Sequence, residues 1–176
     1  MGLKEWYQRL RGKTPAVLSK VKVSLPFGIG EAEWTPDPTE CRAAWALYVE
    51  LVTRIAVQPL EPGQGLLREA LSSLHSLFGT TREILREAGP DVGISRESVG
   101  GIAIAVLNHE DGLRPFLSKW HPLLMSWEAQ RQPDVDPAQH ELAWTYNETL
   151  RGEMDGLRRR LEGYAENLSK IAGVQD

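Results

Sequence analysis

Cysteine and histidine are both scarce in this sequence of 176 residues, which has one cysteine, Cys41, and four histidines. A single thiol cannot form an internal disulfide or supply the Cys/His ligands of a structural zinc site. No histidine stands three residues after a glutamate, the spacing that di-iron helical bundles use. We therefore expect no metal site and no cofactor, and a reducing compartment, the cytoplasm.

Long apolar segments are also missing, because no apolar run approaches the roughly 20 residues that cross a bilayer. The opening residues lack the apolar core of a signal peptide. The net charge is −4, but residues 1–22 carry six basic residues against one acidic, a net +5, which leaves −9 for the remainder. An acidic body argues against nucleic-acid binding, which requires several contacts between basic side chains and phosphates.

Complete catalytic motifs are absent as well. Gly28 and Gly30 begin a dinucleotide-binding pattern, but Glu33 stands where the third glycine belongs. The sequence has no Walker A motif, no nucleophile elbow and no His-Glu-x-x-His pair. These absences favour a protein that is not an enzyme.

The main pattern in the sequence is helical periodicity of its apolar residues. A first helix is predicted to begin after Asp37 as N-cap, and others to cover 66–88, about 95–127 and 136–171. The third is interrupted at 108–112 and carries an interior proline, Pro122, that is expected to kink it. We predict an all-α fold: an antiparallel bundle of four long helices, one broken or kinked. The apolar face of the first helix is predicted to consist of Cys41, Ala44, Trp45, Tyr48, Val52 and Ile55.

The last predicted helix has the most regular pattern. Its apolar positions repeat at steps of three and four, which is typical of a bundle or coiled-coil seam: Ala143, Tyr146, Leu150, Met154, Leu157, Leu161, Tyr164, Leu168 and Ile171. Gly152, Gly156 and Gly163 cluster away from this seam, although an interior glycine costs a helix about 1 kcal/mol relative to alanine. They indicate either a flexible outer surface or a groove for a second helix, from another copy or a partner.

Two short features on and near these helices have competing interpretations. The arginines at 158–160 resemble an anion site, but the flanking seam leucines predict that they fan over an ion-paired, solvated face. Cys41 lies in the first turn of a helix, where a thiol can become reactive, but it also lies on the predicted apolar face. We favour structural packing for this cysteine.

The N-terminal part differs from the rest. Residues 2–11 predict a short amphipathic helix with Leu3, Trp6, Tyr7 and Leu10 on one face, and residues 19–34 predict a small β-hairpin or an extended arm ending at Trp34. We expect an N-terminal arm, 1–36, and a helical bundle, 37–176, in one compact domain. The tryptophans of the arm are candidate binding anchors, because tryptophan is enriched at interaction hot spots.

The predicted helix break at 108–112 carries the most reactive side chains. His109, Glu110 and Asp111 could supply a base and acids there, and His121 lies further along the same helix. A polar corner between helices, capped by an aspartate, accounts for the same residues.

These observations lead to three functional hypotheses. The first is a non-enzymatic interaction or regulatory module that binds a protein partner or a second copy through Trp6, Tyr7, Leu10, Trp34, Gly152, Gly156 and Gly163. The second is a small-molecule-binding or catalytic bundle with its site at His109–Asp111. The third is weak association with a membrane surface through the N-terminal amphipathic helix.

Overall fold

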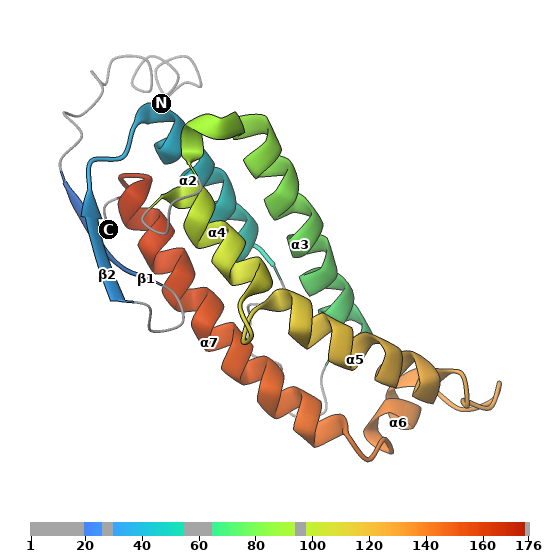
Figure 1. The fold of residues 1–176 in the computed structure, drawn as a ribbon. Coiled ribbons are helices and arrows are strands. Elements are labelled where there is room, and N and C mark those ends of the chain that lie inside the picture. The colour runs from blue at the N-terminus through green and yellow to red at the C-terminus, as the bar shows by residue number, and fades with distance from the viewer. Residues whose placement is uncertain (1–19, 26–29, 55–64, 94–97, 175–176) are drawn as a thin grey trace, which may run out of the picture.

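The fold is mostly helical, with one small two-stranded sheet, in a computed structural model that describes residues 20–25, 30–54, 65–93 and 98–174 (Figure 1). The predicted N-terminal helix with Trp6, Tyr7 and Leu10 lies outside the described residues. The described elements are β1 (Val21–Leu25), β2 (Gly30–Trp34), α2 (Pro38–Val52), α3 (Leu67–Ala88), the 3-10 helix η3 (Gly89–Val92), α4 (Val99–Asn108), α5 (Leu113–Glu128), α6 (Pro137–Leu142) and α7 (Asn147–Ile171).

The predicted hairpin is confirmed. β1 and β2 pair antiparallel, with Val21 opposite Trp34, and the hairpin lies against α7 (Figure 1). Val23 is 1% exposed and belongs to the core, and the Asn167 side-chain amide of α7 donates a hydrogen bond to the Ser24 carbonyl. A two-stranded sheet alone is marginal in water, so this contact with α7 is what stabilises it.

The start of α2 is as predicted, but its buried face is predicted only in part: Ala44 is buried and Tyr48 packs against the core, and Ile55 lies outside the described residues. The Asp37 carboxylate accepts from the backbone N–H groups of Thr39 and Glu40, in a capping box. The core takes Ala43, Ala44, Leu47 and Leu51, whereas Trp45 and Val52 of the predicted face are 50% and 40% exposed. This helix carries apolar residues on several of its sides, so periodicity alone does not determine which face packs inward.

α3 follows the prediction closely, with Leu67, Leu71 and Leu74 buried and Gly89 at its C-terminus at φ 72°. α4 begins later than predicted. Ser98 is itself the N-cap, because its side chain accepts from the Gly101 N–H. The predicted break follows α4, and α5 then continues through Pro122 as one helix.

The last predicted helix is two helices. Asp136 caps α6 as expected, but α6 ends at Leu142 and α7 begins at Asn147. The turn between them shifts the register, so Trp144 is buried whereas Ala143 and Tyr146 are exposed. The rest of the predicted seam is buried: Leu150, Met154, Leu157, Leu161, Tyr164, Leu168 and Ile171.

The core lies between α7 and α2 and extends through α3 to α5, and α4 packs on α5. Trp120 of α5 is 1% exposed and meets Trp144 edge-on, with ring centroids 6.1 Å apart. Among the described helices, none is long and apolar enough to span a membrane.

Candidate functional site

The three glycines of α7 lie on its outer side. Gly152 and Gly163 are exposed, and a Cβ added at either would meet no atom within 4 Å. At Gly156 the nearest atom would be the Arg160 guanidinium nitrogen Nη1, 3.7 Å away. Packing inside the molecule therefore does not require glycine at these positions, and the glycines leave the helix surface low and smooth.

A first hollow, of about 360 Å³, lies where the α4–α5 corner faces α7, and we call it the corner cleft. It is lined by Glu110, Asp111, Gly112, Pro115, Phe116, Lys119, Glu153, Gly156 and Arg160. Two groups of residues singled out from the sequence thus meet here, namely the acidic residues of the helix break and one of the α7 glycines.

Backbone packing shapes the corner. A Cβ at Gly112 would lie 2.5 Å from the Val106 carbonyl oxygen, so only glycine permits this tight turn. His109 is partly buried, and its Nδ1 lies 3.3 Å from the Asp111 backbone nitrogen. The imidazole is therefore engaged with the turn itself, as expected of a polar interhelix corner.

Glu153 is the carboxylate that α7 contributes to the lining of the corner cleft. Lys119 Nζ donates to it at 2.7 Å and Trp120 Nε1 at 2.8 Å. Burial alone raises the pKa of Glu153, but these two donors outweigh it and lower the pKa below its ordinary value. A permanent carboxylate therefore faces Lys119 across this cleft.

His121 is separated from the corner. It faces α3, where its Nδ1 lies 3.4 Å from Arg68 Nη1 and its Nε2 lies 3.4 Å from the Leu71 carbonyl oxygen. The His75 ring is 5.7 Å away between centroids. Burial, with smaller contributions from the Arg68 and His75 charges, lowers the pKa of His121, so the ring is neutral at neutral pH. The structure therefore does not unite His121 with His109–Asp111.

Trp34 is partly buried at the junction of the hairpin, α2 and α4. Its Nε1 donates to Glu40 Oε2 at 3.2 Å, and the same buried carboxylate accepts from the backbone of Asp37 and Val99. Trp34 thus lies at a structural junction rather than on the α7 surface that carries the glycines.

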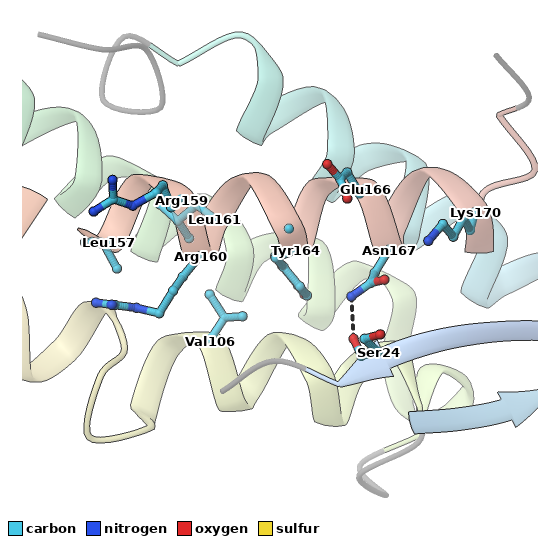
Figure 2. A pocket seen from close by; sticks show the side chains of 11 residues that line it. Ser24, Val106, Leu157, Arg159, Arg160, Leu161, Tyr164, Glu166, Asn167 and Lys170 are labelled. Carbon is cyan, nitrogen blue, oxygen red and sulfur yellow. Dashed lines mark hydrogen bonds between the residues drawn. The ribbon is translucent and has the colours of Figure 1, made fainter. Parts of the chain in front are cut away.

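A second hollow, of about 290 Å³, lies between β1, α4 and α7, and we call it the basic cleft (Figure 2). It is lined by Ser24, Val106, Leu157, Arg159, Arg160, Leu161, Gly163, Tyr164, Glu166, Asn167 and Lys170. The sequence interpretation did not find this cleft, because β1 and α4 reach α7 only through tertiary packing. The one available signal was the arginine run at 158–160.

The three arginines of that run differ. Arg158 pairs with Asp155 and Glu162, and Arg159 pairs with Asp155, so the prediction of an ion-paired face is confirmed for these two. Arg160 is exposed, lines both clefts, and forms no ion pair with any described residue. Arg160 is therefore shared by the corner cleft and the basic cleft.

Tyr164 of the basic cleft is 4% exposed, and its hydroxyl has no hydrogen-bond partner among the described residues. Burial raises the pKa of this phenol far above its ordinary value, so it stays protonated and remains a donor. A buried donor without an acceptor is uncommon in proteins.

Metal-binding and reactive-thiol chemistry find no support in the described part of the chain. No group of three or more His, Cys, Asp and Glu side chains there is placed to hold a metal ion. Burial, followed by the Glu40 and Asp37 charges, raises the pKa of the partly buried Cys41, which keeps the thiol protonated at neutral pH.

No protein family, curated protein or solved structure matches this chain. The surface of α7 and its two clefts are therefore the features from which a function can be proposed.

Proposed function

We propose that this protein is a non-enzymatic interaction or regulatory module of the cytoplasm, which binds a protein partner or a second copy along the outer face of α7. The N-terminal arm, 1–36, contributes to the same association. The observation that supports this most is the continuity of the α7 surface, on which two clefts share Arg160 and each contains one of the α7 glycines.

The length of this surface is suited to a partner segment. From Glu153 to Lys170 the helix rises about 26 Å, at roughly 1.5 Å per residue. The α4–α5 corner borders one end and β1 the other. Helix-in-groove recognition uses channels of this kind, in which small residues allow close approach.

The two ends of the surface differ in charge. The corner cleft is lined by three carboxylates, Glu110, Asp111 and Glu153, against Lys119 and Arg160, whereas the basic cleft is lined by Arg159, Arg160 and Lys170 against Glu166. This difference in charge between the two ends favours one orientation of a bound segment over the reverse.

The scaffold beneath this surface is, in our proposal, an antiparallel bundle of four long helices, with α4 and α5 together serving as the broken one. The four-residue turn between α4 and α5 and the packing of α2 on both α3 and α7 support this arrangement.

Large side chains at the glycine positions of α7 should block the proposed binding surface. The double variant Gly156→Leu, Gly163→Leu places two large side chains on the outer face. A Cβ at Gly163 would meet no atom within 4 Å, a Cβ at Gly156 would meet only the flexible Arg160 guanidinium at 3.7 Å, and leucine favours the helix over glycine. Native mass spectrometry of the full chain should show that the wild type forms a complex and that the double variant does not. Affinity purification from the source cells, with the same pair, extends the test to a protein partner.

Gly79→Leu is the matched control, because Gly79 is an exposed glycine of α3 with equally open surroundings. It should leave association unchanged. A double variant that associates as the wild type does would contradict the proposal.

A second candidate function, small-molecule binding or catalysis at His109–Asp111, is favoured by one observation: Glu110 and Asp111 line the corner cleft. Under this alternative, His109→Ala with Glu110→Ala abolishes ligand binding without lowering the melting temperature. A monomer that retains a small molecule in native mass spectrometry would support it over the interaction module.

A further inference from the structure

We propose that the basic cleft is a binding site for a small organic anion, a molecule with one acidic group and a flat apolar body. Its walls come from three elements, β1, α4 and α7, and Figure 2 shows Val106, Tyr164, Asn167 and Ser24 on the side of α7 that faces α4 and β1. This goes beyond the interaction role, because it assigns a ligand of stated chemistry to one of the two clefts on that surface.

The charge of the cleft selects an anion. Its lining carries three cations, Arg159, Arg160 and Lys170, against one carboxylate, Glu166, in a protein whose net charge is −4. Arg160 and Lys170 are exposed and form no ion pair with any described residue, so their charges are not already neutralised. A guanidinium presents a planar fork of donors that matches a carboxylate, sulfonate or phosphate group.

The apolar lining selects an organic ligand. Leu157 and Leu161 are each 1% exposed and Val106 is 5% exposed, and all three contribute to the walls. The volume, about 290 Å³, is close to the lower limit of small-molecule sites, which begin at roughly 300 Å³. Inorganic phosphate would contact the cations but gain nothing from these apolar side chains.

Tyr164 supplies the second, independent observation. Its side chain extends from α7 to the side of the helix on which Val106 and Ser24 lie in Figure 2, and its buried hydroxyl lacks a partner among the described residues. A ligand acceptor that reaches this hydroxyl would give the donor a hydrogen bond. An unpaired buried donor destabilises the folded protein. Proteins retain such a group where it serves a function, such as binding a ligand.

The experiment uses two fluorescent probes with the same apolar body. One is the anion 1-anilinonaphthalene-8-sulfonate, and the other is its uncharged parent, N-phenyl-1-naphthylamine. Titration of the full chain should show one saturable site for the anion, at least tenfold tighter than for the neutral parent. Inorganic phosphate in millimolar excess should not displace the anion.

Charge-reversal variants locate the site. Arg160→Glu and Lys170→Glu should each weaken binding of the anion at least fivefold. Arg82→Glu makes the same change in net charge on an exposed position of α3 outside both clefts, and it should leave binding unchanged. Tyr164→Phe should weaken binding severalfold while the melting temperature does not fall.

Amide chemical shifts in a ¹⁵N spectrum give a readout that does not depend on fluorescence, and the anion should shift Gly163 and the Asn167 side-chain amide. Equal affinity for the two probes would overturn the proposal. So would charge-reversed variants that bind like the wild type, displacement by phosphate alone, or shifts confined to residues outside the cleft.

Discussion

Tyr164 combines two features that rarely occur together in a protein interior, namely nearly complete burial and a hydroxyl without a partner among the described residues. Its ring belongs to the regular seam of α7, where burial stabilises the fold. Its hydroxyl, in contrast, has given up water without gaining a hydrogen bond. A buried unsatisfied polar group of this kind costs about 1–3 kcal/mol.

Tyr164→Phe keeps the ring and removes the hydroxyl, so we expect it to raise the free energy of unfolding by about 1–2 kcal/mol. For a chain of this size each kcal/mol corresponds to a rise of roughly 2–4 °C in Tm. Urea denaturation and calorimetry of wild type and variant measure the effect.

Tyr146→Phe is the control, since that tyrosine is 49% exposed and its hydroxyl reaches water, and its effect should stay within about 0.5 kcal/mol. If Tyr164→Phe is destabilising instead, then the hydroxyl forms a hydrogen bond in solution and its unpaired state is not a property of the protein.

At the level of elements, sequence periodicity located the helices well where one face alone is apolar. Most of the predicted seam of α7 is buried, and α3 buries Leu67, Leu71 and Leu74 and keeps Phe78 and Leu85 partly buried. Polar residues cover the other side of each helix. α2 is apolar on several sides, and there the sequence did not determine which face packs inward, so Trp45 was misplaced.

Turns and tertiary contacts were the other source of error. The turn after Leu142 divides the last predicted helix, and nothing in the spacing of apolar residues revealed it. The sequence singles out the acidic residues and Gly156 that line the corner cleft, although it does not predict that they meet. The basic cleft cannot be predicted from the sequence, because it depends on how β1 and α4 pack against α7.

Glu141 shows how a tertiary contact replaces a local helix cap. α3 has Leu66 at its N-cap and no side-chain cap of its own, but both carboxylate oxygens of Glu141 lie 2.9 Å from the Leu67 backbone nitrogen. Arg151 lies 3.6 Å from the same carboxylate. Glu141 therefore ties the end of α6 to the start of α3 and to α7.

Burial raises the pKa of Glu141, although the backbone donors and Arg151 act in the opposite direction. A carboxyl with a raised folded-state pKa binds its proton more tightly when folded. Its contribution to stability is therefore complete below the unfolded pKa, about 4.3, and is lost as the pH rises through the folded value.

Glu141→Gln cannot titrate, so we expect the wild type to lose stability relative to this variant as the pH rises from 4 to 7. Urea denaturation of both proteins at intervals of one pH unit measures the difference. Glu148→Gln, an exposed carboxylate on the first turn of α7, controls for the change in charge. If the difference in unfolding free energy between the wild type and Glu141→Gln stays constant with pH, or changes in the opposite direction, then the folded-state pKa of Glu141 is not raised.

At the scale of the whole molecule, the hairpin and the helices share one core. Val23 of β1 is 1% exposed, Trp34 of β2 packs against the core and hydrogen-bonds to Glu40, and Asn167 binds the backbone of β1. The described hairpin residues, 20–25 and 30–34, therefore contribute to the core of the bundle, and the role of residues 1–19, which lie outside the described residues, is a separate question.

Two deletions separate these parts. Removing residues 1–36 exposes the surface of α7 that Val23 covers, and losing one buried valine alone costs about 1.5–3 kcal/mol. We therefore expect this deletion to lower Tm by at least several degrees, or to abolish cooperative unfolding. Removing residues 1–19 takes away Trp6, Tyr7 and Leu10 but keeps the hairpin. If these residues serve the proposed interaction and not the fold, Tm should stay within about 2 °C of the full chain.

Association then distinguishes a binding role for the N-terminal segment from a structural one. If residues 1–19 serve the interaction, the shorter deletion retains its Tm and loses complex formation in native mass spectrometry. If the shorter deletion lowers Tm as much as the longer one, those residues stabilise the fold, and the interaction surface reduces to α7. A shorter deletion that retains both Tm and complex formation leads to the same conclusion about α7, because neither stability nor binding then depends on the segment.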